Sequence, residues 1–230
     1  MALFLLIETG TAVCSVALAR DSHVIALHEN NDGNTHAQLL VPFIDTILQK
    51  QNIEPNMLDA VVVSEGPGSY TGLRVGVSTA KGICYGLQKP LLAVGSLLSL
   101  AYLAIQKKKL PTPDCLIVPM IDARRMEVYT AVFDAKANQL SGVKAEIIDE
   151  NSFTEILKEQ PVLFIGDGAE KCRSLLRHPN AHFADITASA IGMLTPVQLM
   201  FEQQKFVDIA YFEPFYLKDF VVTAKKKSSI

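Results

Sequence analysis

The feature that most constrains the fold is a pattern that occurs twice in the chain. One copy begins at Leu6 and reads LIETGTAVCSVALARDSHVIALHE, and the other begins at Met120 and reads MIDARRMEVYTAVFDAKANQLSGVKAE. Each copy alternates apolar and polar residues, turns and alternates again, which is typical of a meander of strands. When the copies are aligned, the acids Glu8 and Asp122 coincide. The same offset aligns Val16 with Thr130, Ala17 with Ala131 and Leu18 with Val132.

The elements that follow each copy repeat as well. After the first come an amphipathic stretch over residues 35–51, a strand over 60–64, a glycine loop and a helix. After the second come NSFTEILKEQ, a strand and glycine loop in PVLFIGDGAEK, and another helical run. The order strand, strand, strand, helix, strand, helix therefore occurs twice. This repetition predicts an internally duplicated, two-lobe α/β protein with a mixed sheet and helices in each lobe.

The chain has 230 residues, which is enough for two lobes with separate cores. Pro111 and Pro113 follow a lysine triplet and mark a boundary between lobes. We predict an N-terminal lobe over residues 1–105, a C-terminal lobe over 106–222 and a basic tail over 223–230. Within the second lobe, Asn151 and Ser152 with Glu155 have the spacing of a capping box, which predicts a helix start there.

Three short loops are candidates for binding phosphate. VVVSEGPGSYTGLRVG, residues 61–76, reads as a buried strand, a glycine loop and a helix, but it fits neither the dinucleotide fingerprint nor the P-loop. TGT at residues 9–11 and GDG at residues 166–168 follow matched strands of the two halves, and facing turns of this kind can hold phosphate through backbone N–H groups. Ordinary tight turns are the alternative. The candidate nucleotide-loop residues are Glu8, Thr9, Gly10, Thr11, Gly166 and Gly168.

The first long helix is too apolar for a helix that packs only on one sheet. Its apolar residues cover an arc of roughly 200°, whereas packing on a sheet needs a stripe somewhat over 100°. We therefore expect Leu39 and Phe43 to face a second surface. Pro42 predicts a kink or a late helix start. His36 is either an ordinary helix-start residue or part of that second surface.

The helix after the glycine loop carries a stripe of mostly small residues, namely Val75, Thr79, Gly82 and Gly86, besides its core and polar stripes. Mid-helix glycines cost about 1 kcal/mol each relative to alanine, so close packing should offset them. That packing involves either a partner protein or this chain's own sheet or neighbouring helix, and the wide first helix favours a partner. The predicted partner interface is His36, Leu39, Phe43, Val75, Thr79, Gly82 and Gly86.

The other motifs have simpler explanations. Ser78 and Lys81 match the SxxK spacing of acylating enzymes, but the companion motifs are absent and Ser78 falls inside a helix. His178 and His182 have the spacing of a helical metal pair, yet Pro179 lies between them, which favours a surface loop.

Composition excludes several functional classes. The net charge of −3 gives no global attraction for nucleic acid. The chain holds four widely spaced cysteines, which we interpret as buried free thiols: Cys14, Cys84, Cys115 and Cys172. No apolar run approaches the roughly 20 residues of a membrane span, and we expect a cytoplasmic protein without membrane contact.

Taken together, these motifs resemble a known family. The duplicated lobes with turns at ETGT and GDG resemble the actin-like ATPase superfamily. Within it, LLIETGTAVCSVAL, HAQLLVPFIDTIL, the glycine loop with its helix, MIDARRMEVYTAVF and PFYLKD look like the TsaB (YeaZ) family, from about Leu5 to Asp219. Glu8 and Gly10 depart from the family pattern, in which aspartate and serine are more common.

The resemblance implies a noncatalytic subunit of the bacterial machinery that forms N6-threonylcarbamoyladenosine beside the tRNA anticodon. Its implied partners are the catalytic paralogue TsaD and the ATPase TsaE, with tRNA contacted indirectly through the complex. The paralogue's metal-binding HxxxH pair corresponds to Ser96 and Leu100 here, and leucine cannot bind a metal. We therefore expect no catalytic or metal residue and no cofactor in the isolated subunit, with ATP or ADP and metal only when partners are present.

Three hypotheses follow. The first is a scaffold that activates the paralogue through the two helices and forms a homodimer when the paralogue is missing. The second is an ATP-binding actin-like enzyme that acts on its own. The third is a peptidase, which ranks last because the sequence offers no metal pair and no nucleophile with its base.

Overall fold

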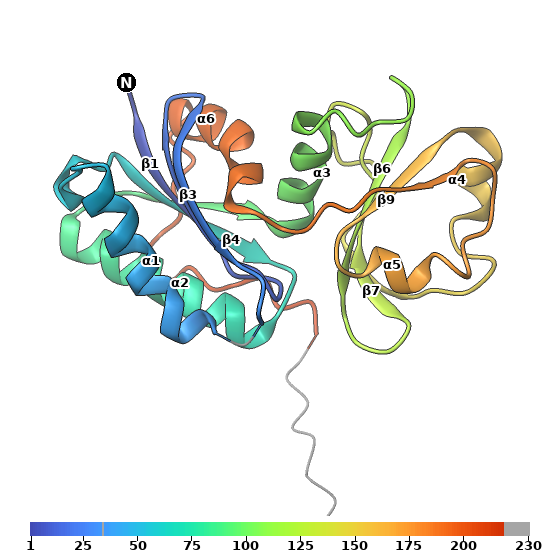
Figure 1. Cartoon of the computed structure of the whole chain (residues 1–230), viewed down its shortest axis with the longest axis horizontal. Coiled ribbons are helices and arrows are strands. Elements are labelled where there is room, and N and C mark those ends of the chain that lie inside the picture. The colour runs from blue at the N-terminus through green and yellow to red at the C-terminus, as the bar shows by residue number, and fades with distance from the viewer. Residues whose placement is uncertain (34, 219–230) are drawn as a thin grey trace, which may run out of the picture.

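A computed structural model describes residues 1–33 and 35–218. The chain forms two lobes, each built on a five-stranded sheet (Figure 1). The first sheet has the order β3-β2-β1-β4-β5 and consists of β1 (Leu3–Glu8), β2 (Cys14–Arg20), β3 (His23–Asn30), β4 (Ala60–Gly66) and β5 (Leu91–Gly95). The second has the order β10-β9-β6-β7-β8 and consists of β6 (Leu116–Asp122), β7 (Glu127–Thr130), β8 (Lys144–Ile147), β9 (Val162–Ile165) and β10 (Ala181–Phe183).

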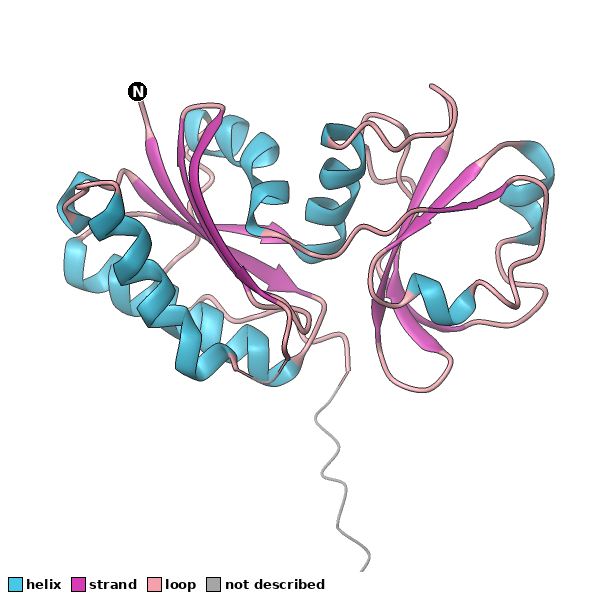
Figure 2. Cartoon of the chain, viewed as in Figure 1, coloured by secondary structure: helices cyan, strands magenta, loops and turns pink. Residues whose placement is uncertain are grey.

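Helices cover both faces of the first sheet (Figure 2). On one face lie α1 (His36–Lys50) and α2 (Tyr70–Leu87), and on the other lie the short 3₁₀ helix η2 (Ala190–Met193) and α6 (Leu194–Glu202). A second 3₁₀ helix, η1 (Pro55–Met57), precedes β4. Leu5 packs in the core beneath α1 and α2, whereas Phe4 packs with Met193 on the opposite side. Because both faces of β1 are buried, its sequence is a continuous apolar run.

The two sheets have the same topology, which confirms the predicted duplicated two-lobe fold. Read from the other edge, the second sheet is β8-β7-β6-β9-β10, and it matches the first strand for strand. In both sheets, the first three strands of the lobe pair antiparallel and the remaining pairings are parallel. The helices follow the same order, with α4 (Thr154–Glu159) and α5 (Ala169–Cys172) in the positions of α1 and α2.

The internal alignment is correct at the acids and wrong by one residue afterwards. Glu8 and Asp122 end β1 and β6 as predicted. Ile7 pairs with Val16, and its counterpart Ile121 pairs with Tyr129, so Val16 does not correspond to Thr130. The predicted pairs Ala17 with Ala131 and Leu18 with Val132 are also wrong by one residue. The reason is a shorter connection, because residues 123–126 join β6 to β7 whereas residues 9–13 join β1 to β2.

The packing of the lobes differs from the predicted boundary between residues 105 and 106. The helix α3 (Ser96–Gln106) lies between the lobes, and Leu97 and Leu100 join the core of the second lobe with Ile117. The chain then returns, so that η2 and α6 complete the core of the first lobe. The predicted basic tail, residues 223–230, lies outside the described residues, as do residues 219–222.

Two local predictions are wrong. Neither Asn151 nor Ser152 caps α4, because Ser152 Oγ bonds Asp149 Oδ1 at 3.0 Å and the helix begins after Phe153. The stretch with His178 is a loop as expected, but His182 lies in β10, where it pairs with Leu163 of β9.

Two other predictions can be compared with the structure. All four cysteines are buried and free, as predicted. Among the described helices, none is long and apolar enough to cross a membrane.

Candidate partner surface and interlobe loops

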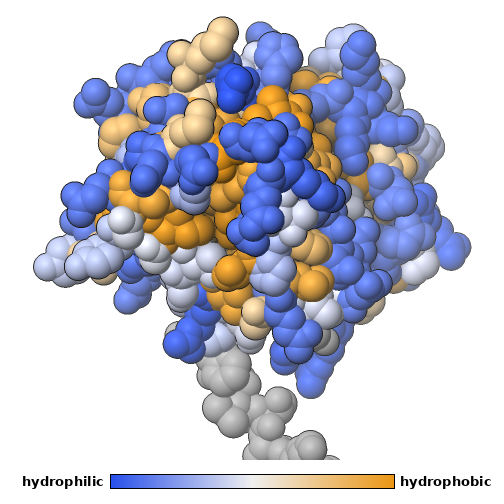
Figure 3. Space-filling view, turned by 60° about the vertical axis from the view of Figure 1, so that its left-hand side comes forward, coloured by the Kyte–Doolittle hydropathy of each residue, from blue (hydrophilic) through white to orange (hydrophobic). Residues whose placement is uncertain are grey.

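The small-residue stripe of α2 faces outward. Val77, Ala80 and Cys84 are buried in the core, which confirms the core stripe. Gly82 and Gly86 are exposed, and a Cβ added at either would meet no atom within 4 Å. The alternative in which these glycines pack on the chain's own sheet or neighbouring helix is therefore wrong. The side of the molecule with α1 and α2 has hydrophobic surface interrupted by polar side chains (Figure 3).

The neighbouring helix α1 adds apolar side chains to this surface. Leu39 and Phe43 are half-buried, since they pack partly on the chain's own core, and the Phe43 ring lies 5.5 Å from that of His28. Val41 is 58% exposed. The helix begins at His36 and runs through Pro42, so the late start does not occur.

His36 does not belong to the exposed surface. It is 7% exposed, and its Nε2 forms a hydrogen bond with the Val13 carbonyl oxygen at 3.2 Å. The side chain therefore anchors the start of α1 to the loop after β1, which is the ordinary helix-start role. Sequence reasoning also missed two exposed residues, Val41 and Tyr85, the second of which is 78% exposed. The aromatic ring of Tyr85 was the signal that it can contribute apolar contact area despite its hydroxyl group.

The α1–α2 face is defined here by the exposed or half-exposed residues of these two helices on the side away from the sheet: Leu39, Val41, Phe43, Val75, Thr79, Gly82, Tyr85 and Gly86. On α2 this face exposes backbone that carries few side chains, and on α1 it exposes apolar side chains. Such a surface allows a helix of another molecule to approach closely.

The glycine turn between β4 and α2 is packed against the loop after β1. A Cβ on Gly68 would lie 2.1 Å from the Gly10 carbonyl oxygen, and one on Gly72 would lie 2.1 Å from the Thr9 carbonyl oxygen. Ser69 N donates to the same Gly10 oxygen at 2.7 Å, and Ser69 Oγ accepts from Gly72 N at 3.3 Å to cap the helix. These glycines therefore permit contact between two stretches of backbone.

Glu8 lies fully buried beneath the predicted nucleotide loop of the first lobe. Its Oε1 accepts from Gly10 N at 2.6 Å and from Ser64 Oγ at 2.8 Å. Burial raises the pKa of Glu8 above its ordinary value, against the lowering effect of these hydrogen bonds, and the Asp167 carboxylate raises it further. Among the described residues, three buried oxygens here have no hydrogen-bond partner: Glu8 Oε2, Thr9 Oγ1 and Ser96 Oγ.

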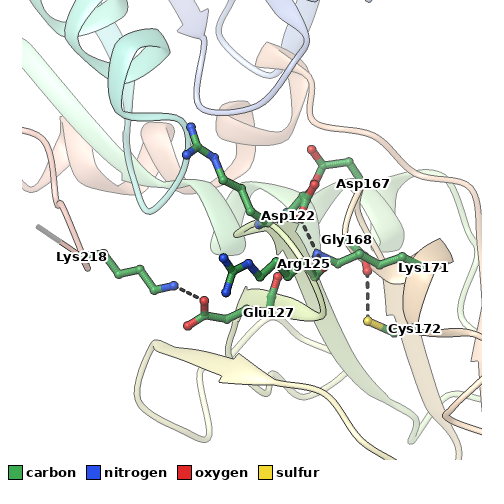
Figure 4. A network of polar contacts seen from close by, with 9 residues as sticks. Asp122, Arg125, Glu127, Asp167, Gly168, Lys171, Cys172 and Lys218 are labelled. Carbon is green, nitrogen blue, oxygen red and sulfur yellow. Dashed lines mark hydrogen bonds and ion pairs between the residues drawn. The ribbon is translucent and has the colours of Figure 1, made fainter. Parts of the chain in front are cut away.

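The GDG loop of the second lobe follows β9, the counterpart of β4, and packs against the end of β6 as the glycine turn packs against the loop after β1. Gly166 has φ +98°, and a Cβ there would lie 2.2 Å from the Met120 carbonyl oxygen. Gly168 N donates to that oxygen at 3.0 Å. Asp167 Oδ1 accepts from Asp122 N at 3.0 Å, and Lys171 forms an ion pair with Asp122 (Figure 4). Desolvation and the neighbouring Asp122 raise the pKa of Asp167.

The two predicted loops do not follow matched strands, because TGT follows β1 whereas GDG follows β9, the counterpart of β4. The two turns still lie close enough for the Asp167 carboxylate to affect Glu8. Thr9 and Thr11 are buried. In the described part of the chain, no group of three or more histidine, cysteine, aspartate or glutamate side chains has a geometry that could hold a metal ion. In both turns, a glycine N–H is used within the chain, because Gly10 N donates to Glu8 Oε1 and Gly168 N donates to the Met120 carbonyl oxygen.

The structure also places the remaining motifs of the sequence. Lys81 Nζ donates to the Phe212 and Ala210 carbonyl oxygens at 3.0 and 3.3 Å, so it serves the fold and not Ser78. Ser96 and Leu100, at which the family resemblance implied the loss of a histidine pair, are each 1% exposed within α3.

Comparisons with known proteins identify the family and the fold. The family model described as TsaD, tRNA N6-adenosine threonylcarbamoyltransferase, matches residues 24–224. Two relatives carry the name tRNA threonylcarbamoyladenosine biosynthesis protein TsaB. One, from Bacillus subtilis, is 32% identical over 93% of this chain and 93% of its own; the other, from Escherichia coli, is 29% identical over 96% of each. The solved structure of YeaZ from Pseudomonas aeruginosa covers 94% of this chain and 100% of its own, with a TM-score of 0.80 at 24% identity, which shows a shared fold. The chain belongs to the TsaB family of tRNA threonylcarbamoyladenosine biosynthesis proteins.

Proposed function

We propose that the protein is a noncatalytic subunit in the formation of N6-threonylcarbamoyladenosine in tRNA, and that it activates a catalytic TsaD-like paralogue. The observation that carries this proposal is the similarity to TsaB relatives over nearly the whole chain, joined to the identity of two residues. The family resemblance implies that Ser96 and Leu100 correspond to the paralogue's HxxxH pair, and both residues are buried. A buried serine and leucine supply no metal ligand set there.

The proposed docking site for the paralogue is the α1–α2 face. It offers close backbone approach at Gly82 and Gly86 with apolar contacts from Val41 and Tyr85 beside them. A paralogue of the same fold carries a corresponding helix pair, so the two chains can pair about an approximate twofold axis. The same symmetry accounts for the homodimer that we propose for the isolated protein.

We propose that nucleotide, the ATPase and tRNA all depend on the assembled complex. In the isolated chain, the loops at Gly10 and Gly168 make backbone contacts of their own, and burial raises the pKa of Glu8. We therefore propose that ATP or ADP with metal binds only when the partners are present, that a TsaE-like ATPase joins the pair, and that tRNA is contacted indirectly. This reaction would take place in the cytoplasm.

The test is reconstitution. The chain, the paralogue and the ATPase are purified separately and incubated with tRNA, threonine, bicarbonate, ATP and the enzyme that makes threonylcarbamoyl adenylate, and modified adenosine is measured by mass spectrometry. We expect no product from this chain without the paralogue, and little from the paralogue without this chain. Product from this chain alone, or an unchanged yield when it is omitted, would contradict the proposal.

A further inference from the structure

The end of the described chain runs back along the first lobe and finishes on the second. We call residues 207–218 the C-terminal strap. It begins at the sheet edge, where Val207 N donates to the Leu91 carbonyl oxygen at 2.9 Å. The side chains of Val207, Ile209 and Phe212 then pack on the core beneath α1 and α2. The strap is therefore part of the first lobe for most of its length.

Further along, the strap is fastened to α2 and to the glycine turn. Lys81, on α2, donates to two strap carbonyl oxygens, as described above. Phe215 N donates to the Glu65 carbonyl oxygen at 2.7 Å, immediately before Gly66. The Tyr216 ring lies 4.6 Å from that of Tyr70, which begins α2. The strap thus holds both sides of the turn that sets the start of α2.

The last described residue reaches the other lobe. Lys218 forms an ion pair with Glu127 on β7, and its Nζ lies 5.9 Å from the centre of the Tyr129 ring on the same strand (Figure 4). The Lys218 and Glu127 side chains are 38% and 24% exposed, so the pair is partly shielded from water and salt. A lysine above an aromatic face adds a cation–π attraction.

This contact is separate from the covalent connections between the lobes. In Figure 1, α3 lies between the lobes in the upper half of the view, the segment leading to η2 crosses near the middle, and the strap ends below both, beside the second lobe. We propose that the C-terminal strap is a latch, in which Lys218 holds the lobes at a fixed separation and Tyr216 keeps the glycine turn ordered. Releasing the latch opens the lobes and loosens the start of α2. The inference stands independently of the proposed function.

The test uses the full-length protein with a spin label on each lobe. Cysteines are introduced as Lys50→Cys on α1 and Ile147→Cys on β8, both exposed, and the four native cysteines are buried. Pulsed electron resonance then reports the interlobe distance. In this background we expect a narrow distribution. Lys218→Ala should broaden the distribution toward longer distances. The long-distance population should be about fivefold larger than in this background, which corresponds to the loss of one surface ion pair.

Three further variants complete the design. Glu127→Gln should act like Lys218→Ala, and the charge-reversed pair Lys218→Glu with Glu127→Lys should restore the narrow distribution. Tyr216→Ala should speed hydrogen exchange of amides in residues 64–73 by about tenfold or more. Lys205→Ala is the matched control, because the Lys205 side chain is exposed and has no partner among the described residues.

The proposal is overturned if Lys218→Ala and Glu127→Gln both keep the original distance distribution while circular dichroism shows them folded. It is also overturned if Lys205→Ala broadens the distribution as much as they do. Should Tyr216→Ala fail to fold, Tyr216→Phe replaces it, and the two charge variants still decide the matter.

Discussion

At the scale of single residues, the glycines of α2 have two opposite roles. A Cβ added at Gly72 or at Gly76 would lie 2.1 Å from an oxygen of Thr9, so the lack of a side chain at these positions allows the loop after β1 to contact the helix. Gly82 and Gly86 touch nothing in this chain. The sequence shows only that the helix is rich in glycine. Which glycine is packed depends on a loop about 60 residues away in the chain, and no local pattern encodes that contact.

These two roles predict opposite effects of the same substitution on stability. Gly72→Ala should lower the free energy of unfolding by about 1–3 kcal/mol, because its Cβ would overlap the Thr9 carbonyl oxygen. Gly82→Ala should raise it by up to about 1 kcal/mol, because alanine is the better helix former and the site is open. Urea denaturation followed by circular dichroism measures both. Changes of the same sign would show that the roles are misassigned.

The buried Glu8 should make the free energy of unfolding depend on pH. Burial raises the pKa of the folded-state carboxyl above its ordinary value of 4.5, so the folded chain holds this proton more tightly than the unfolded chain does. The resulting stability is fully present below pH 4.5 and is lost as pH rises through the raised pKa. Glu8→Gln carries no such proton. Its unfolding free energy relative to the wild type should therefore increase as pH rises from 4.5 to 8, whereas a pH-independent difference would refute the assignment.

At the scale of elements, the two helices of the α1–α2 face show what periodicity can and cannot supply. The outward stripe of α2 follows from helical spacing alone, and so does the excess apolar width of α1. The burial of His36 does not follow, because it depends on the position of the Val13 carbonyl oxygen in a loop between strands. Leu39 and Phe43 are half-buried for a similar reason, since β3 lies close enough to cover part of α1.

Large side chains on the exposed glycines of α2 should prevent the complex and the homodimer from forming without unfolding the chain, because they would lie in the α1–α2 face. Gly82→Leu and Gly86→Leu place a side chain in open space, so the free energy of unfolding should change little, whereas the complex with the paralogue and the homodimer should both be lost. Co-purification and analytical ultracentrifugation report the two assemblies. The control is Glu202→Leu, which adds the same side chain to α6 on the other face of the sheet. Wild-type binding by both glycine variants would exclude this face as the interface.

At the scale of the whole molecule, the duplicated pattern is enough to predict the order of the first six elements of each lobe and a mixed sheet in each. The fifth strand of each sheet, β5 and β10, and the helix α3 were not predicted. Alternation and turn residues are local signals, and their repetition shows only that the same set of elements occurs twice. The return of residues 190–202 to the first lobe is not encoded in that way. Met193 and Val197 are apolar like the residues of either core, and their partner sheet is chosen by shape and chain path.

That return predicts long-range coupling. Met193 is fully buried among residues of β1 and β5, so Met193→Ala should lower the free energy of unfolding by about 2–5 kcal/mol. Amides of β1 should also exchange faster, although they lie about 190 positions earlier in the chain. Leu199→Ala on α6 is the control, because that side chain is 57% exposed and its loss should cost under about 0.5 kcal/mol. Equal effects would contradict the coupling.

The same return has a consequence for biosynthesis. A nascent chain that has emerged from the ribosome only as far as residue 188 lacks η2 and α6, so much of one face of its first sheet, with Phe4 and Leu6, is uncovered. At about 5–20 residues per second, the interval between the completion of β5 and the arrival of α6 is about 5–20 s. We expect the uncovered apolar sheet to bind chaperones during that time, and a product that ends before residue 190 to expose the same surface. Synthesis must therefore pass α6 before the first lobe can become native.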